Sequence, residues 1–290
     1  MDWSRAKTIL IIVFLIADIF LGYQFINQNQ QSSPTITQES INETVARLKQ
    51  HNILVQGTIP NKAIQMPNIK VKYKSFGKNE VINAFFANND KEPNIMTDKE
   101  NLIIEDDKIQ IKIKNEKEFF YLNKAIGKQK SEIDEAKCKN LAEDFLGKVG
   151  IYGAATEIIK KSTTEGYIVI AGVQRYKGLF VDGTHIEMTI NEDGVYKAAI
   201  LWFGDIKPNE SKTKLVISPL KALEKATKYY TDKYVRVNIF EIKQGYYFGT
   251  NEAEQFDLKM IEEGTAVPVW RIKADKATIF INAYNGQLEK

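Results

Sequence analysis

The chain has 290 residues, of which 43% are hydrophobic and 11% aromatic, and this composition supports a folded core and excludes a disordered tail. The 40 Lys and Arg residues against 37 Asp and Glu residues give a net charge of +3, which gives no strong positive field for nucleic-acid binding. A single cysteine, Cys138, excludes an intramolecular disulfide.

The first apolar segment is predicted to be a transmembrane helix. It runs from Thr8 to Ile26 and contains one ionisable residue, Asp18. As a helix, its 19 residues would be roughly 28 Å long, close to the ~30 Å hydrocarbon core of a bilayer. No comparable apolar run follows it in the sequence. All later residues are therefore expected on one side of the membrane.

The residues that flank this segment predict its orientation. Arg5 and Lys7 precede it, whereas residues 27–38 carry no Lys or Arg, so residues 1–7 are expected in the cytoplasm and the C-terminal region outside the cell. Trp3 and Tyr23 lie near the two ends, as interface anchors do. A cleaved signal peptide is the alternative, but it would have a shorter apolar core and a small-x-small cleavage site. We therefore expect an uncleaved, single-pass anchor in the cell membrane.

Asp18 is the candidate interaction residue of this anchor. A carboxylate in mid-span costs about 2.5–3.5 kcal/mol on insertion scales, so a partner that offsets this cost is expected. The residues that share its helix face are Ile11, Phe14, Leu15, Gly22 and Phe25. A polar group beside a small residue is typical of a face that packs closely against a second transmembrane helix. The alternative is a protonated Asp18 that the bilayer tolerates without a partner.

The sequence after the anchor predicts an α+β fold. Residues 27–38 are polar and are predicted to form a short tether. Three units follow, at 39–130, 131–207 and 218–290, each with a helix followed by antiparallel strands. The predicted fold class is therefore one N-terminal transmembrane helix followed by tandem helix-plus-antiparallel-sheet units outside the cell.

A serine opens each of the three predicted helices. Ser40-Ile-Asn-Glu43 is a capping box ahead of the apolar stripe that contains Leu48. Ser131 opens the second helix, whose apolar stripe is Ile133, Cys138, Leu141, Ala142, Phe145 and Val149. Ser218-Pro219 opens the third, with proline at the first helical position.

Alternating apolar residues predict strands at 109–113, 186–190 and 235–239. Two later strands end in hairpin turns, at Thr189-Ile-Asn-Glu-Asp-Gly194 and at Phe280-Ile-Asn-Ala-Tyr-Asn-Gly286. These matching turns indicate that the second and third units are duplicates, with chance recurrence of a common turn as the alternative. The third unit also resembles PepSY-like modules, because Val269-Trp-Arg-Ile272 precedes the strand that ends in the second turn.

The sequence shows little that indicates catalysis. The two histidines, His51 and His185, are outside any metal-ligand motif, and Cys138 falls on an apolar helix stripe, which is typical of an inert buried thiol. We therefore predict no catalytic residue, no cofactor and no metal, and expect that the chain is not an enzyme.

Three local clusters leave alternatives open. The carboxylate pairs Asp106-Asp107 and Glu262-Glu263 would allow glycosidase chemistry, but we expect them to be solvated in loops. Tyr246-Tyr-Phe248 is interpreted as a strand with one buried face, with a sugar- or peptide-binding surface as the alternative.

The opening Met1-Asp-Trp-Ser-Arg-Ala-Lys-Thr-Ile9, followed by Ile11-Ile-Val-Phe-Leu-Ile-Ala-Asp-Ile-Phe-Leu21, resembles the start of the YycI (WalI) family of Gram-positive bacteria. The resemblance extends to length and topology. It implies a membrane regulator that acts with a YycH-like protein on the WalK (YycG) sensor histidine kinase, which with WalR controls cell-wall metabolism. It also implies that the transmembrane helix contacts the kinase while the outer region pairs with the YycH-like protein. A homodimer stays open.

Two other classes of function remain as alternatives. One is an anchored extracellular module that binds a cell-wall fragment or peptide. The other is a cell-wall-modifying enzyme, against which the scarcity of histidine and of clustered acids argues.

Overall fold

The computed structural model describes residues 36–87, 91–126, 135–152, 156–164, 167–209, 214–249 and 262–289. The predicted membrane helix at 8–26 lies outside these residues. Within them, no helix has the length and apolar character needed to cross a bilayer. The four described helices are α2 (Gln38–Gln50), α3 (Lys78–Phe85), α4 (Glu135–Lys148) and α5 (Pro219–Lys233).

One predicted helix begins where local chemistry indicates, whereas the predicted start of the second at Ser131 lies outside the described residues. The hydroxyl of Ser218 accepts a hydrogen bond from the amide of Lys221 at 3.2 Å, and Pro219 is the first residue of α5, which confirms the predicted cap. Four side chains on one face of α5 are buried: Ala222, Leu223, Ala226 and Tyr230. Helix α4 likewise buries Cys138, Ala142 and Phe145 of its predicted stripe, and Val149, just after its last residue, is buried too.

The predicted capping box of the first helix is wrong. Helix α2 begins at Gln38, the last residue of the predicted tether, and its N-cap is Thr37, whose hydroxyl accepts from the amide of Ser40 at 3.3 Å. Thr37 takes the extended conformation of an N-cap residue, and Ser40 is already helical. The predicted apolar stripe holds, because Leu48 is buried together with Thr44.

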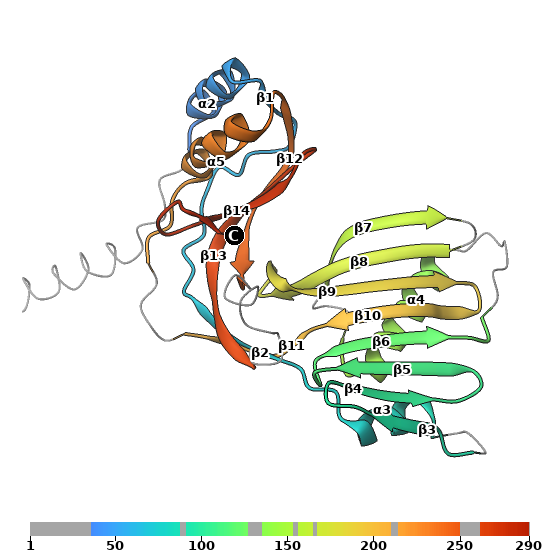
Figure 1. Cartoon of the computed structure of the whole chain (residues 1–290). Coiled ribbons are helices and arrows are strands. Elements are labelled where there is room, and N and C mark those ends of the chain that lie inside the picture. The colour runs from blue at the N-terminus through green and yellow to red at the C-terminus, as the bar shows by residue number, and fades with distance from the viewer. Residues whose placement is uncertain are drawn as a thin grey trace, which may run out of the picture.

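Eight strands form an antiparallel layer that we call the lower sheet (Figure 1). The strand order is β3-β4-β5-β6-β10-β9-β8-β7. The strands are β3 (Asn94–Thr97), β4 (Asn101–Glu105), β5 (Ile109–Lys114), β6 (Glu118–Asn123), β7 (Thr156–Thr164), β8 (Tyr167–Tyr176), β9 (Leu179–Asn191) and β10 (Gly194–Leu201). Helices α3 and α4 pack their apolar side chains into a shared core with this sheet.

The remaining strands form what we call the upper sheet, one face of which is covered by α2 and α5 (Figure 1). Its strands are β1 (Ile53–Val55), β2 (Ile69–Tyr73), β11 (Phe203–Pro208), β12 (Val237–Tyr247), β13 (Glu263–Ala274), β14 (Thr278–Asn282) and β15 (Leu288–Glu289). The predicted strand at 235–239 begins at Val237, and Val235 before it is 90% exposed. Strand β9 pairs with β12, so both sheets are parts of one mixed sheet.

The two predicted hairpin turns are confirmed. The side-chain oxygen of Asn191 accepts from the amide of Asp193 at 3.0 Å, and that of Asn282 accepts from the amide of Tyr284 at 2.8 Å. Gly194 and Gly286 close the turns with φ values of 138° and 73°, which favour glycine. The turns join β9 to β10 and β14 to β15.

The strands of the two later units each pair in chain order, and their duplication remains a prediction from the sequence. After α4, strands β7, β8, β9 and β10 pair in chain order, and after α5, strands β12, β13, β14 and β15 do the same. The same order recurs after α3, where β3 to β6 form a further meander.

The elements of the predicted unit 39–130 are divided between the upper and the lower sheet. Helix α2 and β1 belong to the upper sheet, where Leu48 and Ile53 share a core with α5 and Arg47 pairs with Glu224 at 2.8 Å. Strand β1 is parallel to β12. Helix α3 and strands β3 to β6 belong to the lower sheet. The domain boundaries themselves remain predictions from the sequence.

Candidate functional site

The residues predicted to act in the membrane lie outside the described residues. This holds for the interaction face of Ile11, Phe14, Leu15, Asp18, Gly22 and Phe25, and for the flanking residues Trp3, Arg5, Lys7 and Tyr23. Their roles remain predictions. The candidate site that the structure does describe is the region where the two sheets join.

The residues considered for catalysis occupy separate structural positions. His51 is the C-cap of α2, His185 lies on the surface of β9, and Cys138 is 2% exposed in the core under α4. Asp106 closes the turn before β5, where its carboxylate accepts from the amide of Ile109 at 2.6 Å. Across the described ranges, no group of three or more His, Cys, Asp or Glu side chains is placed to hold a metal ion.

The aromatic residues at the end of β12 share one buried core with upper-sheet strands β2 and β11 and with lower-sheet strands β9 and β10. Phe248 packs edge-on against Phe203 of β11, with ring centroids 5.5 Å apart, and Phe203 stacks on Tyr73 of β2 at 4.7 Å. Tyr246 is 3% exposed, and burial raises its pKa to about 12. These positions confirm the predicted strand with a buried face, although β12 ends at Tyr247 and Phe248 lies just after it.

The opposite face of β12 and β13 carries a charged cluster. Arg271 is 2% exposed, and its Nε and Nη2 donate to one carboxylate oxygen of Glu241 at 3.1 and 2.9 Å. Lys243 and Lys273 also lie 3.1 and 3.4 Å from that carboxylate. Burial alone would raise the pKa of Glu241, but these three cations hold it below its ordinary value.

This cluster is connected to the lower sheet through β9. The Arg271 guanidinium lies 3.9 Å from the ring centroid of Phe180, a buried residue of β9. Burial also raises the pKa of Asp182, two residues further along the same strand. The sequence did not indicate the contact between Arg271 and Phe180, because arginine side chains in strands are usually exposed to solvent.

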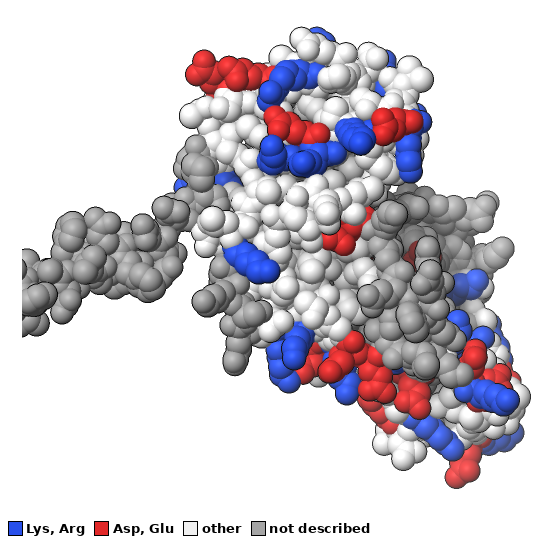
Figure 2. Space-filling model, turned by 60° about the vertical axis from the view of Figure 1, so that its left-hand side comes forward, with Lys and Arg blue, Asp and Glu red and all other residues white. Residues whose placement is uncertain are grey.

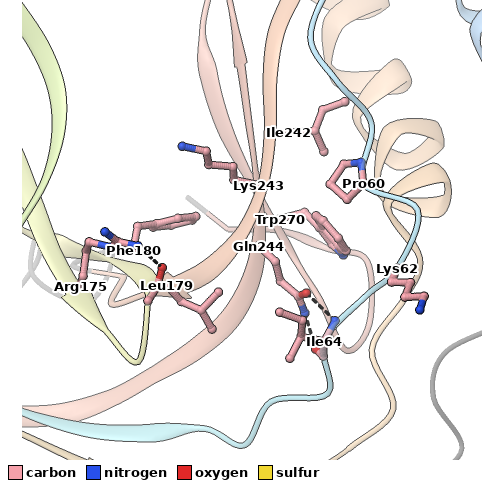
Figure 3. A pocket seen from close by; sticks show the side chains of 11 residues that line it. Pro60, Lys62, Ile64, Arg175, Leu179, Phe180, Ile242, Lys243, Gln244 and Trp270 are labelled. Carbon is pink, nitrogen blue, oxygen red and sulfur yellow. Dashed lines mark hydrogen bonds between the residues drawn. The ribbon is translucent and has the colours of Figure 1, made fainter.

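A pocket of about 300 Å³ lies beside this joint. Figure 3 shows the tip of the β8–β9 hairpin on one side and the linker after β1 on the other, with β12 between them. The lining residues are Pro60, Lys62, Ile64, Arg175, Gly178, Leu179, Phe180, Ile242, Lys243, Gln244 and Trp270. The amide of Gln244 donates to the carbonyl of Ile64 at 2.6 Å and accepts from its N–H at 2.7 Å, which fixes the linker wall.

Comparison with known proteins identifies the family. The family model described as YycI protein matches residues 29–284, which is most of the chain. No curated protein matches the chain. Among solved structures, the chain is similar to the C-terminal domain of Bacillus megaterium YpeB, with 14% sequence identity and a TM-score of 0.43, over 75% of this chain and 97% of that one. Because the family match extends over most of its length, this chain belongs to the YycI family.

Proposed function

We propose that this chain is a non-enzymatic, membrane-anchored regulator that acts with a YycH-like partner on a WalK-like sensor histidine kinase and so on cell-wall metabolism. The observation that carries this proposal is the YycI family match over residues 29–284. The proposed protein is single-pass, with a cytoplasmic N-terminus and an extracellular C-terminal region.

In this proposal the transmembrane helix contacts the transmembrane helices of the kinase. A helix that binds one arrangement of the kinase better than another shifts the balance between signalling states. A differential affinity of ~1.4 kcal/mol changes the ratio of the states about tenfold. One hydrogen bond from Asp18 together with close packing at Gly22 is of the size needed.

The described part of the chain begins close to the upper sheet. The amide of Ile36 donates to the carbonyl of Asn61 at 2.9 Å, in the linker after β1. Residues 27–35, even fully extended, reach at most about 32 Å. This attachment supports an outer region that stays near the bilayer, with the upper sheet closest to the anchor.

The outer region offers a surface suited to a protein partner. On the face shown in Figure 2, charged side chains gather at the two ends, and the area between them carries few charges. Charged residues are depleted from the cores of protein interfaces. We propose that the YycH-like partner contacts the outer region at this sparsely charged area.

The proposal is tested by substituting Asp18 in the full chain. We expect that Asp18→Leu still inserts into the membrane but co-purifies with less of the kinase, because the intramembrane hydrogen bond is lost. Ile16→Ala, on the other side of the same helix, is the matched control and should leave co-purification unchanged. Equal recovery of the kinase with wild type and Asp18→Leu would contradict the proposed contact.

A further inference from the structure

One end of the upper sheet carries an exposed apolar side chain among basic ones. The loop from α5 to β12 forms this end together with the turn between β13 and β14 (Figure 1). The amide of Asn238 donates to the carboxylate of Asp275 in that turn at 2.8 Å. The residues around it line a hollow of about 630 Å³ that we call the basic end: Lys233, Tyr234, Val235, Arg236, Asn238, Asp275 and Lys276.

Val235 is held on the outside of the molecule by its two neighbours. The amide of Tyr234 donates to the carbonyl of Tyr230 at 2.8 Å, and the Tyr234 side chain packs against the core under α5. Val237, which follows in β12, is 1% exposed. Val235 between them is 90% exposed, the most of any large apolar side chain in the described part of the chain. Its apolar surface has no role in the core and is free for a partner.

The charges around Val235 are mainly positive. Lys233, Arg236 and Lys276 line the basic end, and Asp275 is the one carboxylate that lines it, which leaves an excess of two positive charges. Lys276 lies 3.7 Å from the Asp275 carboxylate. Lys233 and Arg236 form no ion pair with any carboxylate among the described residues. A surface of this kind attracts an anionic partner.

A second hollow, lined by the β3–β4 and β5–β6 turns, has the opposite balance. Its volume of about 610 Å³ is close to that of the basic end. Its charged residues are Lys78, Asp98, Lys99, Glu100, Glu116, Lys117 and Glu262. Four acidic residues against three basic ones give no attraction for an anionic surface. Of these two hollows, the basic end is therefore the one that suits such a surface.

The length of chain before α2 allows the basic end to reach the bilayer. Helix α2 begins two residues after Ile36 and spans about 20 Å with its 13 residues. Its far end lies at the basic end, since the carbonyl of Asn52 accepts from the amide of Val237 at 3.1 Å. Residues 27–35 reach at most about 32 Å, which exceeds the length of α2. A membrane anchor at 8–26 thus leaves enough chain for this contact.

We propose that the basic end docks on a bilayer surface that contains anionic lipids, with Val235 among the headgroups and Lys233, Arg236 and Lys276 facing the lipid phosphates. Peripheral membrane contacts combine apolar insertion with attraction to anionic lipids in this way. Each Lys or Arg near such a surface strengthens the contact about fivefold. This inference rests on the proposed membrane anchor and adds an orientation, with the basic end of the upper sheet against the bilayer.

The test places an environment-sensitive fluorophore on Val235→Cys in the full chain, reconstituted in phosphatidylcholine vesicles with or without phosphatidylglycerol. Native Cys138 is 2% exposed, so the new surface cysteine is labelled selectively. We expect lipids that carry a quencher near the headgroup to quench this label in vesicles with phosphatidylglycerol, and much less in vesicles without it. The matched control is Met96→Cys, labelled on β3 of the lower sheet at a residue that is 43% exposed, which should not be quenched.

Charge variants then test the basic residues. The triple variant Lys233→Gln/Arg236→Gln/Lys276→Gln should lower the ratio of docked to undocked chains about a hundredfold, so quenching at residue 235 should fall to the level at residue 96. Lys108→Gln/Lys112→Gln/Lys197→Gln removes three exposed positive charges from the lower sheet and should leave the quenching at residue 235 unchanged.

Flotation of the vesicles after an alkaline wash tests the anchor separately. A chain that does not float would overturn the anchor and, with it, the docking. A chain that floats overturns the docking alone in three cases: no quenching at residue 235, equal quenching at residues 235 and 96, or equal quenching with and without phosphatidylglycerol. Unchanged quenching in the variant of the three basic-end residues would overturn it as well.

Discussion

Loss of the Glu241 carboxylate should destabilise the joint between the two sheets. Arg271 is 2% exposed and donates two hydrogen bonds to Glu241, which is itself 24% exposed. Removing one partner of a fully buried ion pair costs about 3–5 kcal/mol. Glu241 keeps some contact with water, so we expect Glu241→Gln to lower the free energy of unfolding by about 2–3 kcal/mol.

Urea unfolding of the full chain in an uncharged detergent, followed by circular dichroism, measures this loss. The matched control is Asp205→Asn, which breaks an ion pair with Lys207 whose side chains are 47% and 71% exposed. This control should cost less than about 1 kcal/mol. Replacing both partners, as Glu241→Leu/Arg271→Met, should recover part of the loss because no unpaired charge stays buried.

The pH dependence of this pair has a defined sign. The pKa of Glu241 in the folded chain lies below its ordinary value of 4.5. Its stabilising effect is therefore fully present above pH 4.5 and is lost as the pH falls through the lower, folded-state pKa. The reasoning is refuted if Glu241→Gln costs no more than Asp205→Asn at pH 7, or if the difference between wild type and Glu241→Gln does not shrink in acid.

Two further substitutions test the same region. Gly245→Ala would place a Cβ 2.4 Å from the buried ring of Phe180 and should lower the free energy of unfolding by about 1–3 kcal/mol. The control Gly147→Ala in α4, where a Cβ would meet no atom within 4 Å, should not lower it. Equal melting temperatures of the two variants would contradict this reasoning. Asp182→Asn should stabilise the chain at pH 7, because burial raises the folded-state pKa of Asp182 above its ordinary value of 3.8. The gain should begin to shrink as the pH falls below that raised pKa and should be gone below pH 3.8, where the carboxyl is protonated in the folded and the unfolded chain. A gain that persists at pH 3 would be inconsistent with this reasoning.

Features governed by neighbouring residues could be predicted from the sequence. The cap at Ser218-Pro219 and the turns ending in Gly194 and Gly286 are local, because a side chain or a positive φ within a few residues determines them. The start of α2 was misplaced for a related reason. Thr37 and Ser40 are both good caps, and the sequence alone did not show that the helix continues back to Gln38.

Features that depend on distant residues could not be predicted. The pairing of Ile53 with Val237 joins strands far apart in the chain, and no local periodicity records it. The burial of Arg271 depends on Phe180 of another unit and on Glu241 of the neighbouring strand. The pocket also depends on strand pairing between distant residues, so the sequence indicated the membrane anchor but not the pocket beside β12.

Kinase output in cells that carry only part of the chain tests the regulatory account most directly. One variant keeps residues 1–35 and lacks the rest, and the other keeps residues 27–290 behind an unrelated single-pass helix of equal length. The account predicts that the first variant retains a measurable effect on kinase output and that the second loses most of it. Full regulation by the second variant, with none by the first, would contradict a mechanism through the transmembrane helix.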